Sequence, residues 1–485
     1  MESPRSEMML IDGIWRNASD GGTVDVENPA NRAVVATVPK ATADDLAEAL
    51  AAAERVRGSG SETNSWQRSA ILRRAANNLR ERLDEIALLL TEEQGKTLPE
   101  ARGEVNSAAE QFDWYADEAR RIYGRTVEGP LGSVRAEVRH EAIGPVAAFT
   151  PWNFPVMLAA RKLAPALAAG CPIILKPAEE APSACLAMVR AVADAGVPAG
   201  AIAAVTGDPA FVSATLLDSP IIRKVSMTGS VRVGQILMSL ASKHMAAVSF
   251  ELGGHAPVIV CDDVDVKAVA ALAVRTKYRN AGQVCVAPTR FLVARSILDE
   301  FEAEFTRASA ALALGDGMDG ASEVGPLCSA RRHDDFAALV EDAVSRGAVA
   351  TTGGVSLREK LGGHFYAPTV LRDIPADARV LQEEPFGPVA LLVAYDDLNE
   401  AVELANNTQF GLAGYVFTDD VSRAQLLSER LRVGMVGVNT FAIANAAVPF
   451  SGVGLSGMGA ESGAEGIQMY LRPKTVVTGI SETLH

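Results

Sequence analysis

Short apolar runs alternate with helical patterns through the middle of the chain. The runs cover residues 145–149, 172–175, 202–205, 224–227 and 248–252. Apolar side chains recur at helical spacing between them, over residues 156–169, 183–195, 209–217 and 231–243. Buried strands that alternate with helices predict a parallel sheet with right-handed crossovers. Ligands bind beyond the carboxyl ends of such strands, so the residues that follow each run are the candidates for chemistry.

A second alternation predicts a second α/β domain in the C-terminal half. We expect its strands at residues 257–261, 289–293, 389–394, 415–418 and 434–438. Before the first alternation, amphipathic helical patterns occupy residues 41–57, 66–93 and 101–122. Two further segments have their own character: residues 124–142 alternate in polarity and predict a hairpin, and the glycine-rich residues 449–459 predict a tightly turning loop.

Composition narrows the class of protein. The 485 residues are 48% hydrophobic and 22% charged, which is typical of a soluble globular protein of two or three domains. Lys and Arg number 45 against 60 Asp and Glu, so the formal charge of −15 argues against nucleic acid as a partner.

Cysteine use and apolar runs bear on the compartment. The five cysteines are odd in number and show no C-x-x-C spacing, which disfavours a disulfide framework or a zinc site. We expect a reducing compartment, no metal and, since neither a signal peptide nor a membrane span is found in the sequence, a cytoplasmic location.

Polar residues at the ends of the expected strands suggest a binding site. Asn153 lies between Pro151 and Pro155, so its side-chain amide has a fixed direction, as an oxyanion donor requires. Lys176 and Glu179 could bind ribose hydroxyls, and an acidic residue there would repel the 2′-phosphate of NADP. The alternatives are a structural turn and a solvated loop pair.

Three more segments carry candidate chemistry. Gly229 and Ser230 come between a strand and a helix, whose first N–H groups could meet a pyrophosphate. Glu251 precedes two glycines that allow close approach of a ligand, as a general base requires, and Cys285 follows a glycine-containing turn that could expose a nucleophilic thiolate. A plain strand-to-helix turn explains the segment with Gly229 and Ser230 about as well, and a helix- or loop-facing surface carboxylate is the alternative for Glu251. A last rigid, acidic segment contains Glu384 and Phe386.

Together and in this order, these segments resemble the aldehyde dehydrogenase superfamily over essentially the whole chain. The matching motifs are PWNFP, KPAE, TGS-x₄-G, ELGG, GQ-x-C and EEPFGP. The resemblance implies an α/β fold of the aldehyde dehydrogenase type, with a Rossmann-type NAD-binding domain formed by residues 1–123 and 143–252. It further implies an α/β catalytic domain at 253–467, and a small β oligomerisation element at 124–142 and 468–485 that joins a homodimer or homotetramer.

The resemblance also assigns roles to single residues. Cys285 would attack the aldehyde, the amide of Asn153 and the backbone N–H of Cys285 would hold the oxyanion, and Glu251 would activate water against the thioester. The cofactor implied is NAD. The residues that would line its path are Trp152, Lys176, Glu179, Gly229, Ser230, Leu252, Glu384 and Phe386.

The substrate follows from two arginines. Arg161 and Arg279 resemble the residues that bind the distal carboxylate in succinate-semialdehyde dehydrogenases, which implies an acidic semialdehyde such as succinate semialdehyde. A surface position is the alternative for each arginine. Residues 441–448 lack the serine that helps to bind that carboxylate, and 2-oxoglutarate-semialdehyde dehydrogenases show similar segments. A cofactor-independent thiol esterase that uses Cys285, Asn153 and Glu251 is a further alternative.

Overall fold

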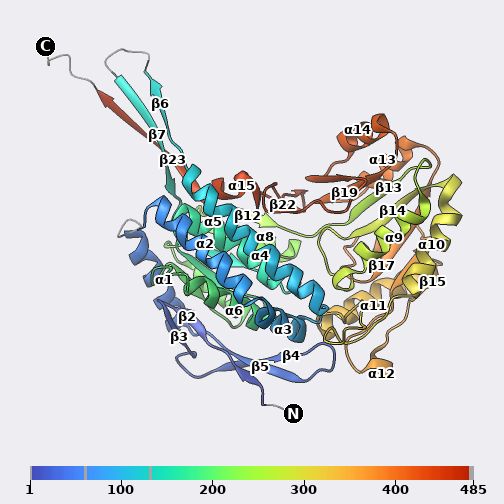
Figure 1. Ribbon diagram of the computed structural model, residues 1–485, viewed down its shortest axis with the longest axis horizontal. Helices are drawn as coiled ribbons and strands as arrows, with labels where there is room; N and C mark the ends of the chain where they lie inside the picture. The colour runs from blue at the N-terminus through green and yellow to red at the C-terminus, as the bar shows by residue number, and fades with distance from the viewer. Residues whose placement is uncertain (1–2, 59–62, 130–133, 480–485) are drawn as a thin grey trace.

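The computed structural model describes residues 3–58, 63–129 and 134–479. Two α/β halves lie side by side, and a narrow antiparallel arm projects from the first half (Figure 1). No helix in these ranges is long and apolar enough to cross a membrane.

The first half is built on a largely parallel sheet, as predicted. Its parallel strands are β8 (Val146–Phe149), β9 (Ile173–Lys176), β10 (Ile202–Ala204), β11 (Lys224–Thr228) and β12 (Ala247–Glu251). Short antiparallel strands extend both edges of the described sheet: β2 (Met9–Ile11) with β3 (Ile14–Arg16) beyond β10, and β22 (Gly457–Met458) beyond β12.

The strand order creates a binding crevice. β8 lies in the middle, with β9 and β10 on one side and β11 and β12 on the other. The chain therefore reverses its direction of winding between β8 and β11, and open α/β sheets bind ligands beyond the strand ends at such a point. Asn153 follows β8 and Ser230 follows β11, so both residues lie at the end of the sheet where such a ligand binds.

Helices cover both faces of this sheet. The crossovers are α5 (Pro155–Ala169), α6 (Pro182–Ala193), α7 (Pro209–Asp218) and α8 (Val231–Ser242), all at the predicted places. The N-terminal layer contains α1 (Ala43–Gly58), α2 (Ser65–Glu81), α3 (Leu83–Gln94) and α4 (Leu98–Glu118). The helical pattern over 66–93 is interrupted at Arg82 (φ −102°, ψ 16°), where Asp84 and Glu85 favour a new helix N-terminus.

The second half also has the predicted sheet. Its described strands run in the order β15 (Val349–Thr352), β16 (Thr369–Arg372), β17 (Val389–Tyr395), β14 (Pro288–Ala294), β13 (Ala256–Val260), β19 (Ala413–Phe417) and β20 (Met435–Val438). All neighbours are parallel except β15, and neither β15 nor β16 was expected. The surrounding helices are α9 (Val266–Lys277), α10 (Leu298–Ala310), α11 (Ala330–Ser345), α12 (Arg358–Leu361), α13 (Leu398–Asn406) and α14 (Val421–Arg430).

The glycine-rich segment 449–459 is more ordered than the predicted loop. It contains β21 (Val453–Gly454), which pairs with β18 (Phe410–Gly411), and then β22, which pairs with the end of β12. Gly457 lies opposite Glu251 in this pairing. The segment therefore closes the edge of the first sheet next to a candidate catalytic carboxylate, and α15 (Gly463–Gln468) follows it.

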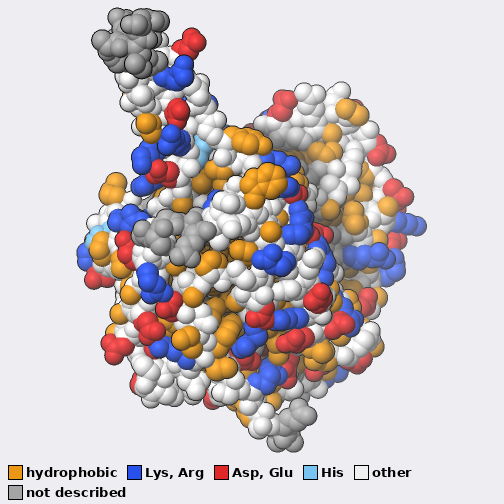
Figure 2. All heavy atoms as spheres, turned by 60° about the vertical axis from the view of Figure 1, so that its left-hand side comes forward, with side chains coloured by type: hydrophobic (Ala, Val, Ile, Leu, Met, Phe, Trp, Pro, Cys, Tyr) orange, Lys and Arg blue, Asp and Glu red, His pale blue; other side chains and the backbone are white. Residues whose placement is uncertain are grey.

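The arm consists of β6 (Arg125–Glu128), β7 (Val134–Ala142) and β23 (Leu471–Gly479), with β7 between the other two. The antiparallel pairing of β6 with β7 confirms the predicted hairpin. Its side chains are largely exposed, and basic and acidic groups alternate along it (Figure 2). The tip at 130–133 and the end of the expected tail at 480–485 lie outside the described residues. A separate small sheet combines β1 (Arg5–Ser6), β5 (Val34–Pro39) and β4 (Thr23–Glu27).

Candidate active site

The predicted ribose-binding pair lies at the carboxyl end of β9. Lys176 is the last residue of that strand and is 4% exposed, and its ammonium forms an ion pair with Glu179. β9 is the neighbour of β8, so this pair is next to the crevice. Across the crevice, Ser230 caps the N-terminus of α8 and accepts a hydrogen bond from the Val233 N–H. The strand order therefore places a cation and an anion after β9 and a helix N-terminus after β11, on the two sides of β8.

A second group of predicted residues lies where the two halves meet. The N–H of Gly254 donates to Oε1 of Glu384 (2.8 Å), and a Cβ at position 253 would be only 2.4 Å from Oε2 of the same carboxylate. A larger residue at position 253 would therefore displace the Glu384 carboxylate from its present place. Burial raises the pKa of Glu384 to about 7. Phe386 contacts Trp152 edge to face, with ring centroids 5.5 Å apart.

Two further cofactor candidates, Gly229 and Leu252, come directly after β11 and β12. Gly229 follows β11, and its N–H donates to the carbonyl of Glu251 (3.0 Å). Leu252 follows β12 and donates its N–H to the carbonyl of Ser456 (2.9 Å). Both positions are thus fixed by backbone hydrogen bonds rather than by flexible side chains.

Cys285 follows an unusual turn, η2 (Arg279–Gly282). Asn280 and Ala281 have left-handed backbones with φ near 50°, and Gly282 has φ 73°. A Cβ at Gly282 would lie 2.2 Å from the carbonyl oxygen of Gly387, so glycine is required there. A run of left-handed residues is strained and persists only where the surroundings enforce it. The turn leaves Cys285 half-buried, whereas the other four cysteines are buried; all five are free.

The electrostatics of Cys285 disfavour the thiolate in the absence of ligand. Burial raises the pKa of the Cys285 thiol to about 12, and the charges of Glu384 and Glu251 raise it further, while Arg161 opposes them. The thiol is therefore largely protonated near neutral pH and needs a base to become a nucleophile.

Asn153 is joined to the cysteine turn. Its side chain is 3% exposed, and Nδ2 donates to the carbonyl of Gln283 (3.1 Å). Oδ1 is buried without a hydrogen-bond partner among the described residues. The backbone carbonyl of Asn153 accepts from Nζ of Lys96 (2.7 Å) and from Nδ2 of Asn280 (3.0 Å). The structure thus brings the predicted oxyanion donor and the predicted nucleophile together.

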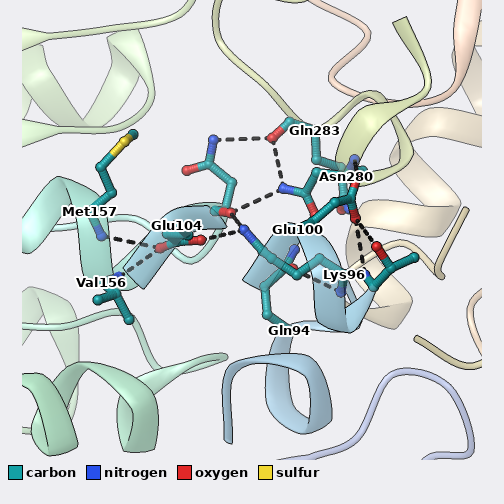
Figure 3. Close-up of polar contacts among 10 residues, drawn as sticks. Gln94, Lys96, Glu100, Glu104, Val156, Met157, Asn280 and Gln283 are labelled. Carbon is teal, nitrogen blue, oxygen red and sulfur yellow. Dashed lines mark hydrogen bonds and ion pairs between the residues drawn. The ribbon is translucent and has the colours of Figure 1, made fainter. Parts of the chain in front are cut away.

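A buried ion pair at the start of α4 supports this arrangement (Figure 3). Lys96 and Glu104 are 2.5 Å apart, and both side chains are fully buried. Glu104 also accepts from the N–H groups of Val156 and Met157, at the N-terminus of α5. The sequence analysis missed this pair. Its signal in the sequence is a lysine just before α4, followed by Glu100 and Glu104, which lie one turn apart on that helix.

Glu251 is the last residue of β12 and is 2% exposed. Its Oε2 is buried and has no hydrogen-bond partner in the described ranges. Burial and the charge of Glu461 raise the pKa of Glu251 well above its usual value, against the opposing charges of Lys162 and Arg161. A buried carboxyl group with a raised pKa suits a general base, and the alternative of a surface carboxylate is excluded.

A cavity of about 280 Å³ leads to Cys285. Arg161 is 2% exposed and stacks its guanidinium on Phe450 (4.2 Å to the ring centroid), so a surface position is excluded for this residue. Arg279 is exposed and stacks on Phe154 (5.3 Å) at another part of the same lining. The cavity therefore joins a thiol with one buried and one exposed cation, a combination that fits a reactive group with an anionic tail.

Comparisons with known proteins agree with this geometry. Residues 15–476 match the model of the aldehyde dehydrogenase family. The chain belongs to that family.

Among its relatives is the 4-(hydroxymethyl)benzenesulfonate dehydrogenase of Comamonas testosteroni, 45% identical over 97% of this chain and 98% of the relative. The NADP-dependent succinate-semialdehyde dehydrogenase of Escherichia coli K12 is 41% identical, with 98% of each chain covered. The crystal structure of succinate-semialdehyde dehydrogenase from Burkholderia pseudomallei superposes with a TM-score of 0.95 at 40% identity, over 99% of this chain and 100% of that one.

The protein is therefore an aldehyde dehydrogenase with the α/β fold of that family, an oxidoreductase that acts on aldehydes with NAD(P). Its own residues fit such a cofactor: the Gly254 N–H and the Glu384 carboxylate lie side by side where the two halves meet, and the N-terminus of α8 follows β11 at the point where the strand order reverses. A dinucleotide meets a protein through such groups.

The charge around Cys285 leads to a prediction. We expect Glu384→Gln to speed alkylation of Cys285 by iodoacetamide at pH 8 about threefold or more, because removing a nearby negative charge lowers the thiol pKa and increases the thiolate fraction. The rate is measured without cofactor, against Cys285→Ala as the background from the buried cysteines.

The neighbouring Glu383→Gln is the matched control, because Glu383 is exposed and pairs with Arg379. Equal acceleration in both variants, or slower alkylation in Glu384→Gln, would contradict the electrostatic account.

Proposed function

We propose that the protein oxidises an anionic aldehyde to the carboxylic acid, with NAD as cofactor and an acidic semialdehyde such as succinate semialdehyde as substrate. The observation that carries this proposal is the cavity that unites Cys285 with Arg161 and Arg279. A guanidinium binds a carboxylate through two parallel hydrogen bonds, so an anionic tail on an arginine would direct the aldehyde group toward the thiol.

The proposed chemistry has two stages. In the first, the Cys285 thiol passes its proton to solvent and forms a bond to the aldehyde carbon, while the carbonyl electron pair moves to oxygen. The amide of Asn153 and the N–H of Cys285 stabilise this oxyanion; one such donor is typically worth about 3–4 kcal/mol. A nicotinamide dinucleotide held by Lys176, Glu179 and Glu384 would supply the hydride acceptor for oxidation of this thiohemiacetal to a thioester on Cys285.

In the second stage Glu251 takes a proton from water. The resulting hydroxide attacks the thioester carbon, the carbon–sulfur bond breaks, and the acid leaves with the cysteine restored. The raised pKa of Glu251 supports this role, because a carboxylate with a higher pKa binds the proton of water more strongly. The overall reaction consumes aldehyde, NAD⁺ and water, and yields acid, NADH and protons.

The relatives favour an anionic substrate and leave the type of anion to experiment. The names of the two relatives reported above specify a sulfonate and a semialdehyde that carries a carboxylate. Both anions suit an arginine. The cavity is lined by Asn445 and its neighbours Ala444 and Ala446. These residues belong to the segment 441–448, which lacks the serine that helps to bind the carboxylate in succinate-semialdehyde dehydrogenases. A semialdehyde of 2-oxoglutarate is an alternative carboxylate substrate.

The proposed preference for NAD over NADP rests on the charged residues at the carboxyl end of β9. The carboxylate of Glu179 would accept hydrogen bonds from the ribose hydroxyls and would repel a 2′-phosphate, whereas Lys176 alone would attract one. The pair formed by Lys176 and Glu179 supports a choice of NAD over NADP.

The division into domains is also a proposal. Residues 1–123 and 143–252 would form the NAD-binding domain, and residues 253–467 the catalytic domain. The hairpin at 124–142 and the tail from 468 would join subunits in a homodimer or homotetramer, since the arm stands apart from the body with exposed strands (Figure 1).

Two substitutions test the covalent mechanism. We expect Cys285→Ala to abolish both NADH formation and ester hydrolysis, and Glu251→Gln to lower kcat by about 10²–10⁴. The second variant retains the nucleophile, so it releases one equivalent of NADH and accumulates acylated Cys285, which mass spectrometry detects.

Turnover in Cys285→Ala would remove the nucleophile assignment. Ester hydrolysis that needs no NAD, without NADH formation from any aldehyde, would favour the thiol esterase alternative.

The arginines generate a test of substrate class. We expect Arg279→Ala and Arg161→Ala to raise KM for succinate semialdehyde about tenfold or more, because each loses a charge-assisted hydrogen bond. KM for butyraldehyde, which has no charge, changes less than about threefold. Arg275→Ala is the matched control, because Arg275 is exposed on α9. A sulfonated aldehyde in the same assay identifies the preferred anion. Equal effects on KM for charged and neutral aldehydes would show that Arg161 and Arg279 do not bind the anionic group of the substrate.

The cofactor proposal is tested by Glu179→Gln. We expect kcat/KM for NADP to rise relative to NAD by about tenfold, because the repulsion of the 2′-phosphate is removed while the site keeps its shape. The ratio of the two kcat/KM values in one variant is its own control against partial misfolding. An unchanged ratio would show that Glu179 does not select the cofactor.

A further inference from the structure

Asn280 lies in the turn before Cys285 and contacts the loop that carries Asn153, and the mechanism above does not use it. Its side chain is 3% exposed, and its backbone is left-handed (φ 50°, ψ 37°), a conformation that Asn adopts more readily than most residues. Its place in the turn before Cys285 makes its side chain available for contacts with both loops.

The amide of Asn280 bridges these loops. Nδ2 donates to the carbonyl of Asn153 (3.0 Å) and to the carbonyl of Gln283 (3.3 Å). An amide has two N–H groups, so both are used. The carbonyl of Gln283 also accepts from Nδ2 of Asn153 (3.1 Å). One N–H of the Asn153 amide is thereby fixed on Gln283, and the second remains for an oxyanion.

Two groups from the start of α4 hold the bridge in place (Figure 3). The N–H of Asn280 donates to Oε1 of Glu100 (2.8 Å), and Lys96 donates to the carbonyl of Asn153 (2.7 Å). The bridge is therefore attached on one side to Glu100 on α4 and on the other to Lys96 in the short connection that leads into α4, which limits how far the two loops can separate.

We propose that Asn280 is a positioning residue for the oxyanion: by holding the carbonyls of Asn153 and Gln283, it directs the free N–H of the Asn153 amide toward the aldehyde oxygen on Cys285. The inference rests on the proposed function, in which Asn153 is the oxyanion donor. Small displacements of such a donor reduce the rate of the chemical step more than substrate binding.

The test removes the side chain without disturbing the backbone. Asn280→Gly keeps a residue that favours a left-handed conformation, and Ala281→Gly, in the next left-handed position, adds the same flexibility without loss of a side-chain hydrogen bond. We expect Asn280→Gly to lower kcat about tenfold to a hundredfold with KM changed less than about threefold. Ala281→Gly stays within about twofold of the parent in both constants.

A double-mutant cycle shows whether Asn280 acts through Asn153. Asn153→Ala alone is expected to lower kcat about 10²–10³. If Asn280 only positions Asn153, the double variant is no slower than Asn153→Ala, within about threefold. A multiplicative loss in the double variant, or an equal loss in Ala281→Gly, would overturn the role of Asn280 and leave the proposed function intact.

Unchanged kcat in Asn153→Ala would instead remove the oxyanion assignment itself, and the positioning role with it. Should Asn280→Gly fail to fold, Asn280→Asp takes its place, because it retains the size of the side chain and replaces both N–H donors by acceptors. The same non-additivity with Asn153→Ala is then expected, and additive losses would reject the inference.

Discussion

The active site depends on one buried ion pair, between Lys96 and Glu104. Moving two charges out of water costs several kcal/mol for each ion, and their mutual attraction repays this only when the remaining hydrogen-bonding groups also find partners. Here they do: Lys96 donates to the carbonyl of Asn153 and lies 3.9 Å from the ring centroid of Phe154, while Glu104 accepts from two N–H groups of α5. Each of these partners belongs to the loop or helix that carries the oxyanion donor, so satisfying the buried charges also fixes the site.

The same N-terminal layer orients the cofactor side. Neither α5 nor α6 has a side-chain hydrogen bond from its own N-cap residue. A buried carboxylate supplies the cap instead: Glu104 on α4 for the first helix, and Glu93 on α3 for the second, through the N–H groups of Ser183 and Ala184. Because the first N–H groups of a helix have no partner within the helix, these hydrogen bonds tie α5 to α4 and α6 to α3, and α5 and α6 are the helices that follow Asn153 and Lys176.

The elements that could be predicted from the sequence are those with a local or periodic pattern of apolar residues. Strands β8 to β12 and their helices follow from the alternation of apolar runs, and Cys285, Glu251 and Asn153 stand out because each lies beside proline or glycine at a strand end. Strands β2 and β3 were not predicted, since three residues are too few to show a period. The bonds from Lys96 to Asn153 and from Asn280 to Asn153 join residues 57 and 127 positions apart, and no spacing along the chain indicates such contacts.

Burial of the site has two opposing effects on the proposed reaction. A low local dielectric strengthens every hydrogen bond to an oxyanion, yet it also raises the pKa of Cys285 and of Glu251. The thiol is thus protonated in the ligand-free protein near neutral pH, which limits its oxidation because the thiolate is the reactive form. Arg161 is the buried cation that opposes both shifts. In the proposed mechanism, desolvation therefore keeps the Cys285 thiol inactive, and the positive charge of Arg161 favours the thiolate once a base removes the proton.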